Sequence, residues 1–97
     1  HDLLRFAKAL ESGELISKDT LARAVSSQNR LGGYGYGFVI HDSGKLRGYG
    51  HSGGAPGMNS DLRIFPELGY VVVALSNLDP PAASMVVEHY VARMPVD

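Results

Sequence analysis

Residues 48–57 read Gly-Tyr-Gly-His-Ser-Gly-Gly-Ala-Pro-Gly and carry one histidine and one serine among five glycines. The segments on both sides have the residue types of β-strands. Glycine allows the backbone to approach another group closely or to adopt positive φ. A polar pair framed by such residues constrains the fold, because neighbouring elements must fit around a strand that exposes its backbone. We therefore take this stretch as the candidate site.

The flanking sequence predicts an α+β fold. Apolar spacing indicates two N-terminal helices, an antiparallel sheet of three to four strands and a C-terminal helix packed on that sheet. Turn residues separate the strands. We expect a first helix capped by Asp2 and ended by Gly13, and a short second helix capped by Ser17. We expect strands at residues 34–41, 46–54, 60–65 and 70–75, turns at 42–45, 55–57 and 66–69, and a final helix opened by residues 79–81 and ended by Pro95.

The spacing of apolar residues predicts which faces of the last two strands and of the final helix are buried. Residues 60–65 alternate, which predicts a half-buried strand with Leu62 and Ile64 inside and Arg63 toward solvent, where it can pair with Asp61. Residues 70–75 are apolar on both faces, so we expect cover from two sides. The final helix has an apolar stripe at Ala83, Val86, Val87, Tyr90, Val91 and Met94.

Size and composition narrow the function classes. The 97 residues make a single domain, 1–97, and a net charge of −1 leaves no electrostatic footprint for nucleic acid or an anionic membrane. The absence of cysteine excludes disulfides and thiolate chemistry, and no run is long enough for a membrane segment. We expect no cofactor. A chain that starts at His1 and enters a helix at once is typical of a fragment cut from a longer chain.

The sequence of the candidate stretch matches two known motifs, one for binding a dinucleotide and one for a catalytic serine. Gly48-x-Gly50-x-x-Gly53 matches the dinucleotide fingerprint, but that loop must open a helix, and Pro56 follows here. The sequence around Ser52 also matches the G-x-S-x-G nucleophile elbow, and its triad partners would be Asp79 and His89. The segment before Ser52 is not a buried apolar strand, which argues against the elbow.

A metal site is a further alternative. His41 and His51 could face each other across the hairpin, but no acidic or cysteine cluster completes a ligand set. Tyr34, Tyr36 and Tyr49 either line a pocket or cover faces of the sheet.

A third interpretation rests on four motifs in order. These motifs resemble the C-terminal part of the serine β-lactamase-like family, which includes class C β-lactamases, D-alanyl-D-alanine carboxypeptidases and related esterases. The first helix also resembles one in that family, so the likeness spans nearly the whole chain. The motifs are Tyr34-Gly-Tyr-Gly-Phe38, Gly50-His-Ser-Gly-Gly-Ala-Pro-Gly57, Asp61-Leu-Arg-Ile-Phe-Pro66 and Val71-Val-Val-Ala-Leu-Ser-Asn77.

The resemblance implies roles for the candidate stretch. The family uses S-x-x-K, Y/S-x-N and a strand motif K-T-G or H-x-G, and His51-Ser52-Gly53 matches H-x-G. His51 would support proton transfer or hold a substrate carboxylate. Ser52 would offer a hydroxyl to substrate, Gly53 would admit the nucleophile without a β-carbon clash, and the backbone N–H of Gly54 would donate to the oxyanion. His51 and Gly54 are thus the catalytic candidates, and Ser52 and Gly53 the substrate-binding ones.

The nucleophile that this scheme needs is missing. The sequence contains no S-x-x-K and no Y-x-N, and Ser27-Gln-Asn29 fits S-x-N too close to His51 to match the family arrangement. We expect the chain alone to be inactive and its parent to hydrolyse a β-lactam, an ester or a D-Ala peptide. The resemblance suggests a bacterial, often periplasmic or extracellular, protein.

Two alternatives remain beside this interpretation. The chain could be a stand-alone α+β binding or assembly module, or a serine enzyme of the α/β-hydrolase type that uses Ser52. The resemblance also implies that strand 71–75 is flanked in the family by an N-terminal strand that is absent here. We therefore expect a homo-oligomer through that apolar edge, or its burial against another polypeptide.

Overall fold

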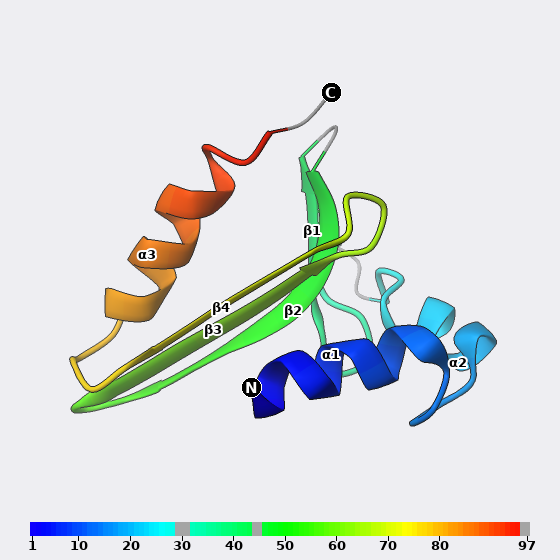
Figure 1. Cartoon of the computed structure of the whole chain (residues 1–97), viewed down its shortest axis with the longest axis horizontal. Coiled ribbons are helices and arrows are strands. Elements are labelled where there is room, and N and C mark those ends of the chain that lie inside the picture. Colours follow the sequence, from blue (N-terminus) through cyan, green and yellow to red (C-terminus); the bar gives the residue numbers. More distant parts are fainter. Residues whose placement is uncertain (29–31, 44–45, 96–97) are drawn as a thin grey trace.

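The computed structural model describes residues 1–28, 32–43 and 46–95 and confirms the α+β prediction. Within those residues, three helices flank a four-stranded antiparallel sheet of order β1-β2-β3-β4, in which each strand pairs with the next along the chain (Figure 1). The elements are α1 (Asp2–Ser12), α2 (Lys18–Ala24), β1 (Val39–Ser43), β2 (Leu46–Ala55), β3 (Met58–Phe65), β4 (Tyr70–Ser76) and α3 (Ala82–Val91).

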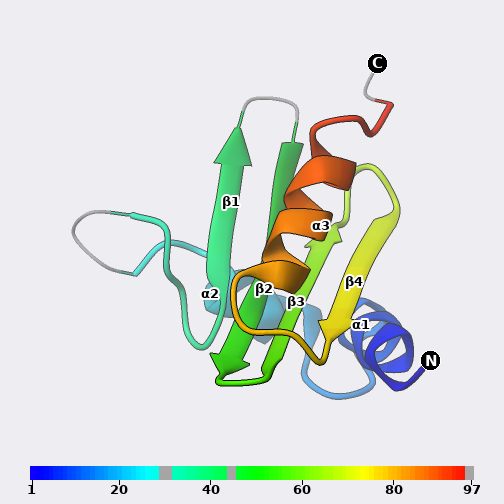
Figure 2. The same ribbon diagram turned by 90° about the vertical axis from the view of Figure 1, so that its left-hand side faces the viewer.

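The sheet is the middle of three layers. In Figure 2, α3 lies in front of the four strands, and α1 and α2 lie behind them. Contacts of α3 fall on β3 and β4, and α1 contacts α2 and β4. No helix in the described part of the chain is both long and apolar enough to cross a bilayer.

The N-terminal helices form where capping residues predict them. Gly13 ends α1 in the left-handed conformation, with φ of 85°. The Ser17 side chain caps α2 by accepting a hydrogen bond from the Thr20 N–H. One detail of the prediction is wrong: the N-cap of α1 is His1, and Asp2 is already helical, where its charge favours the positive end of the helix dipole.

The first strand is shorter than predicted. Residues 34–38 lie outside the ladder except for an isolated bridge from Tyr34 to Val39, because the Tyr36 N–H bonds to the carbonyl of Ala24 in α2. Of the expected turn at residues 42–45, Asp42 and Ser43 belong to β1, and residues 44 and 45 lie outside the described ones. The segment before β1 therefore bonds to α2 and, through the Gly33 carbonyl, to Ile40 of β1 without forming a ladder.

The hydrophobic core lies between the sheet and the two N-terminal helices. Tyr49 of β2 and Leu62 and Ile64 of β3 pack there against Ala7 and Leu10 of α1. Leu62 and Ile64 thus face inward, as the alternation predicts. Burial of these side chains fixes the register of β2 against β3, because a shift by one residue would turn the apolar set to the opposite face.

The last strand and the last helix are less buried than predicted. Val71 packs against the core, but Val73 is 37% exposed and Leu75 70% exposed. On α3 only Ala83 and Val87 are fully buried.

The predicted stripe of α3 is therefore wrong at two positions. Val86 and Tyr90 are exposed because the strand beside them, β4, is the last of the sheet and no further described strand covers them. Together with β4 they line an open apolar groove of about 750 Å³. The helix itself begins at Ala82, and Pro81 is its N-cap.

Candidate functional site

Residues 51–55 of β2 have a strand partner on one side only. The β1 ladder pairs Ser43–Val39 with residues 46–50 and ends at Gly50, whereas the β3 ladder continues to Ala55. Every residue from 51 to 55 is exposed. Within the described residues, the outer edge of this half of β2 therefore faces no strand.

Neighbouring candidate residues point to opposite faces, because side chains alternate along a strand. His51 pairs with Leu62, whose side chain lies on the core face toward α1 and α2. Ser52 pairs with Asp61, which lies on the α3 face. The sequence does not reveal this separation, since the two residues are adjacent and both polar.

His51 is held through both ring nitrogens. Its Nδ1 lies 2.6 Å from the carbonyl oxygen of Ser52, and its Nε2 lies 3.1 Å from the hydroxyl oxygen of Tyr34. The rings of His51 and Tyr34 meet edge to face, with centroids 5.9 Å apart. A carbonyl oxygen can only accept, so Nδ1 carries a proton, and in the neutral ring Nε2 accepts the Tyr34 O–H. Sequence reasoning placed Tyr34 in a pocket or on a sheet face and did not assign it this contact.

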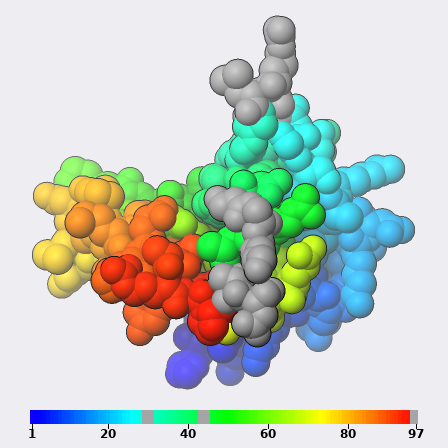
Figure 3. Space-filling view, turned by 90° about the horizontal axis from the view of Figure 1, so that it is seen from above, coloured from blue at the N-terminus to red at the C-terminus, as the bar shows by residue number. Residues whose placement is uncertain are grey.

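Ser52, Gly53 and Gly54 line an open groove of about 620 Å³ together with Asn59 and the segment 79–84 that leads into α3. Figure 3 shows this end of the molecule, where the segment before α3 (yellow) lies beside green atoms of the β2–β3 hairpin. His51 does not line this groove. The structure therefore brings three of the four predicted site residues to one groove and places the fourth on the other face of the strand.

The two central glycines differ in their surroundings. A β-carbon on Gly54 would lie 2.7 Å from Cγ of Pro80, so the proline packs directly on this residue. A β-carbon on Gly53 would meet only the Ser60 hydroxyl oxygen, at 3.2 Å. Close packing within this chain thus accounts for glycine at position 54, whereas at position 53 the space above the strand is nearly free.

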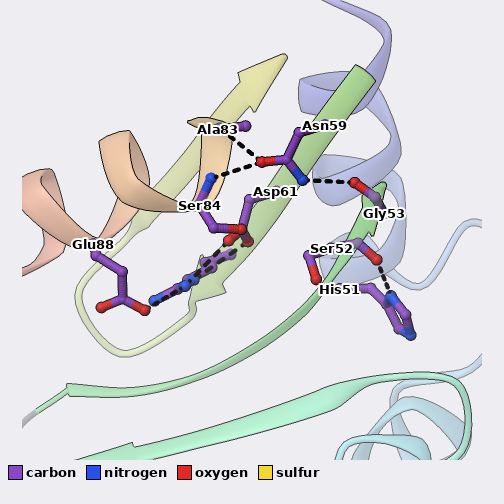
Figure 4. Close-up of polar contacts among 9 residues, drawn as sticks. His51, Ser52, Gly53, Asn59, Asp61, Ala83, Ser84 and Glu88 are labelled. Atoms are coloured by element: carbon purple, nitrogen blue, oxygen red, sulfur yellow. Dashed lines mark hydrogen bonds and ion pairs between the residues drawn. The ribbon is translucent and has the colours of Figure 1, made fainter. Parts of the chain in front are cut away.

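Asn59 and Asp79 fix the hairpin to the start of α3. The Asn59 amide bonds to Gly53 and to the first turn of α3, and the Asp79 carboxylate accepts a hydrogen bond from the Gly57 N–H (Figure 4 for Asn59). The sequence predicts neither role, and Asn59 has no distinguishing signal because Asp61 and Arg63 on the same face of β3 are polar as well.

A buried ion pair lies beneath α3 on the same face as Ser52. Arg63, 8% exposed, donates to both oxygens of Asp61 and, at 2.7 Å, to the Glu88 carboxylate of α3. Burial acts to lower the pKa of Arg63, but the hydrogen bonds and charges of Asp61 and Glu88 raise it above its ordinary value. The prediction of a solvent-facing Arg63 is wrong because α3 covers this face, although its pairing with Asp61 is confirmed.

His41 belongs to this α3 face and not to a metal site. It pairs with Gly48, three residues before His51, so the two histidines point to opposite faces and do not meet. Among the described residues, no group of three histidine, cysteine or acidic side chains could hold a metal ion. Burial, and then the charge of Arg63, lower the pKa of His41.

The elbow and the dinucleotide motif both fail on topology. Ser52 lies inside β2, which continues into β3, whereas both motifs need a turn from a strand into a helix. His89 lines the groove at the edge of β4, and Ser52 and Asp79 line the other one. The three residues therefore do not assemble as a triad.

Fold and site together define a class of protein: an α+β domain whose exposed strand half carries an H-x-G motif. A family model described as Beta-lactamase matches residues 1–94. The chain therefore belongs to the Beta-lactamase family, which agrees with the resemblance to serine β-lactamase-like proteins. Comparisons with curated proteins and with solved structures returned no match.

Proposed function

We propose that the chain supplies the H-x-G wall of a serine acyl-hydrolase site that acts on a β-lactam, an ester or a D-Ala peptide, of the class C β-lactamase, carboxypeptidase or esterase type. The exposed half of β2 supports this proposal, because residues 51–55 offer backbone and side-chain groups along an edge without a strand partner in the described residues. Membership of the Beta-lactamase family indicates a serine acyl-hydrolase-like origin.

Each residue of the stretch has a separate task in this proposal. The N–H of Gly54 donates to the oxyanion that forms when the acyl carbonyl is attacked, and one such donor is worth about 100-fold in rate or more. The Ser52 hydroxyl, in the groove beside Gly54, contacts the substrate. His51, on the other face of β2, supports proton transfer or holds a substrate carboxylate through its ring, which Tyr34 orients.

The chain on its own has no nucleophile in this scheme. The test is incubation of the purified chain with a chromogenic cephalosporin, an activated ester and a fluorophosphonate, followed by intact mass measurement. We expect neither turnover nor an adduct. An adduct on Ser52, lost in Ser52→Ala, would contradict the proposal and restore Ser52 as a nucleophile.

A positive test adds the missing motifs. If the reading frame upstream of His1 encodes S-x-x-K and Y-x-N, the extended protein should hydrolyse one of the three substrates, and the preferred one identifies the type. His51→Ala should then lower kcat by about 100-fold. His89→Ala, on the exposed face of α3, is the matched control and should leave kcat unchanged. An extended protein with both motifs that acylates with none of the substrates would contradict the proposal.

We also propose that the chain alone forms a homo-oligomer through the outer edge of β4. The strand ends the sheet, and the apolar side chains Leu75, Val86 and Tyr90 are exposed beside it. An apolar edge favours pairing with a second copy. Light scattering should give a dimer or larger species that Leu75→Lys disrupts. A monomer at all concentrations would contradict this part of the proposal.

A further inference from the structure

The side chain of Asn59 connects the candidate site to α3. It is 7% exposed and makes three hydrogen bonds. Its Oδ1 accepts from the backbone N–H groups of Ala83 (2.7 Å) and Ser84 (3.2 Å), and its Nδ2 donates to the carbonyl oxygen of Gly53 (2.8 Å; Figure 4). Two donors on one side and a carbonyl on the other fix which end of the amide carries the oxygen.

The bond to Gly53 determines where the next N–H points. Within the described residues only the peptide bond Pro80–Pro81 is cis, so the Gly53–Gly54 peptide is trans. In a trans peptide the C=O and the following N–H point in opposite directions. Because the Gly53 carbonyl points to Asn59 of β3, the Gly54 N–H points away from β3. It faces the side on which β1 has already ended, at Gly50.

Without a hydrogen bond that holds it, the Gly53–Gly54 peptide would rotate more easily than the neighbouring peptides. It lies between two glycines, which have the widest choice of backbone angles. The β2–β3 ladder also ends only one residue further on, at the pair Ala55 and Met58. A buried amide bonded to the Gly53 carbonyl removes the freedom of the peptide plane to rotate.

We propose that Asn59 is a positioning residue of the site, which aims the Gly54 N–H at the acyl oxygen. This inference rests on the proposed function, in which that N–H stabilises the oxyanion. Asn59 acts through Gly53 and touches no substrate. The Oδ1 of Asn59 also caps the first turn of α3. The direction of the Gly54 N–H is therefore fixed by α3 as well as by the β2–β3 hairpin.

The substitution Asn59→Asp separates the two functions of the side chain. A carboxylate still accepts from Ala83 and Ser84, and aspartate is a good N-cap, so the start of α3 is retained. It cannot donate to Gly53, and it places an oxygen against the carbonyl oxygen. The readout is the N–H residual dipolar coupling of Gly54 in the ¹⁵N-labelled chain, which reports the direction of this bond.

We expect Asn59→Asp to change the Gly54 coupling while the couplings of Tyr49 and Ile64 stay as in the wild type. Lowering the pH below about 4 protonates the introduced carboxyl group and restores an O–H donor. The Gly54 coupling should then return to the wild-type value measured at the same pH. A Gly54 coupling that is unchanged in Asn59→Asp would overturn the inference.

A second variant and an independent result complete the test. Asn59→Ala loses donor and acceptor and should change the couplings of Ala83 and Ser84 as well as that of Gly54. The measurement needs no substrate, so its outcome is independent of the acylation experiments. A coupling that responds as expected beside an extended protein that never acylates would refute the proposed function and leave the positioning of the N–H standing.

Discussion

The two halves of β2 have the same glycine-rich composition and opposite surroundings. Residues 46–50 lie between β1 and β3, and Tyr49 there is 3% exposed and packs in the core. Residues 51–55 keep only β3 as a partner, and all are exposed. In the first half, glycine lets neighbouring strands pack closely. In the second half, Pro80 packs on Gly54, but the space above Gly53 is nearly free.

Gly50 and Gly53 show the difference most clearly. A β-carbon on Gly50 would lie 1.8 Å from the carbonyl oxygen of Leu62, a backbone atom that cannot move away without disturbing β3. The corresponding atom on Gly53 would approach only the side chain of Ser60. The first glycine is required by the fold, whereas at the second the fold of this chain requires little.

The largest expected effect comes from adding one methyl group in each half. Gly50→Ala should destabilise the chain by about 4 kcal/mol or more, because the strands must separate to admit it. Gly53→Ala should cost less than about 1 kcal/mol, since a rotation of the Ser60 side chain makes room. Urea denaturation of both variants and the wild type measures the difference. Equal losses of stability would remove the distinction between the halves.

The next largest loss of stability tests how β3 supports residues 51–55, the half of β2 that pairs with β3 alone. Asp61 pairs with Ser52 in the ladder and is 4% exposed. Asp61→Ala leaves the buried guanidinium of Arg63 with only Glu88 and should cost about 3 kcal/mol.

Glu88→Gln is the matched control for the ion pair. Glu88 is largely exposed, so this change should cost less than about 1 kcal/mol. Denaturation curves in which the two variants lose the same stability would show that burial of the ion pair does not decide its contribution.

A smaller change in stability, of opposite sign, is expected at Tyr49, in the half of β2 that lies between β1 and β3. Its hydroxyl is buried and has no hydrogen-bond partner among the described residues. Tyr49→Phe removes this group and should stabilise the chain by about 1 kcal/mol. Thermal denaturation at neutral pH measures the change, and a loss of stability would indicate a partner for the hydroxyl.

The same variant has a pH signature. Burial, with a smaller contribution from the charge of Glu11, raises the pKa of Tyr49 to about 12. The unfolded chain ionises near the ordinary value of about 10, so the wild type should lose stability as the pH rises from 10 toward 12. Tyr49→Phe should lack this part of the decline.

The smallest expected effect is the loss of stability that His41 causes in acid. His41 pairs with Gly48, in the half of β2 that lies between β1 and β3. Its pKa is lowered in the folded state, so near and below pH 6.5 the unfolded chain binds more protons. Stability should therefore fall as the pH drops through 6.5. His41→Gln should flatten this slope, and His89→Gln is the control for removing an exposed histidine. A slope that His41→Gln leaves unchanged would contradict the assignment.

Patterns along the sequence predict much of this fold. Alternation placed Leu62 and Ile64 inward, and the caps at Gly13 and Ser17 bounded the first two helices. The meander followed from the turn residues. These predictions succeed because they depend on neighbours along the chain.

The errors come from contacts between distant elements. Arg63 is buried because α3 covers its face, and Val86 is exposed because the sheet ends beside it. At the site, the sequence did not show that His51 and Ser52 would lie on opposite faces of β2, and the partners Tyr34 and Asn59 come from other elements and left no local signal. The catalytic roles of His51 and Gly54 remain predictions.

Amide hydrogen exchange tests the central claim most directly, because it compares the backbone of the two halves in one experiment. The N–H of Tyr49 lies between two strands, and that of Gly54 points to the edge that β1 leaves free. We predict slow exchange at Tyr49 and exchange close to the unprotected rate at Gly54. Equal protection of the two amides would contradict the claim that residues 51–55 offer a free donor to a substrate.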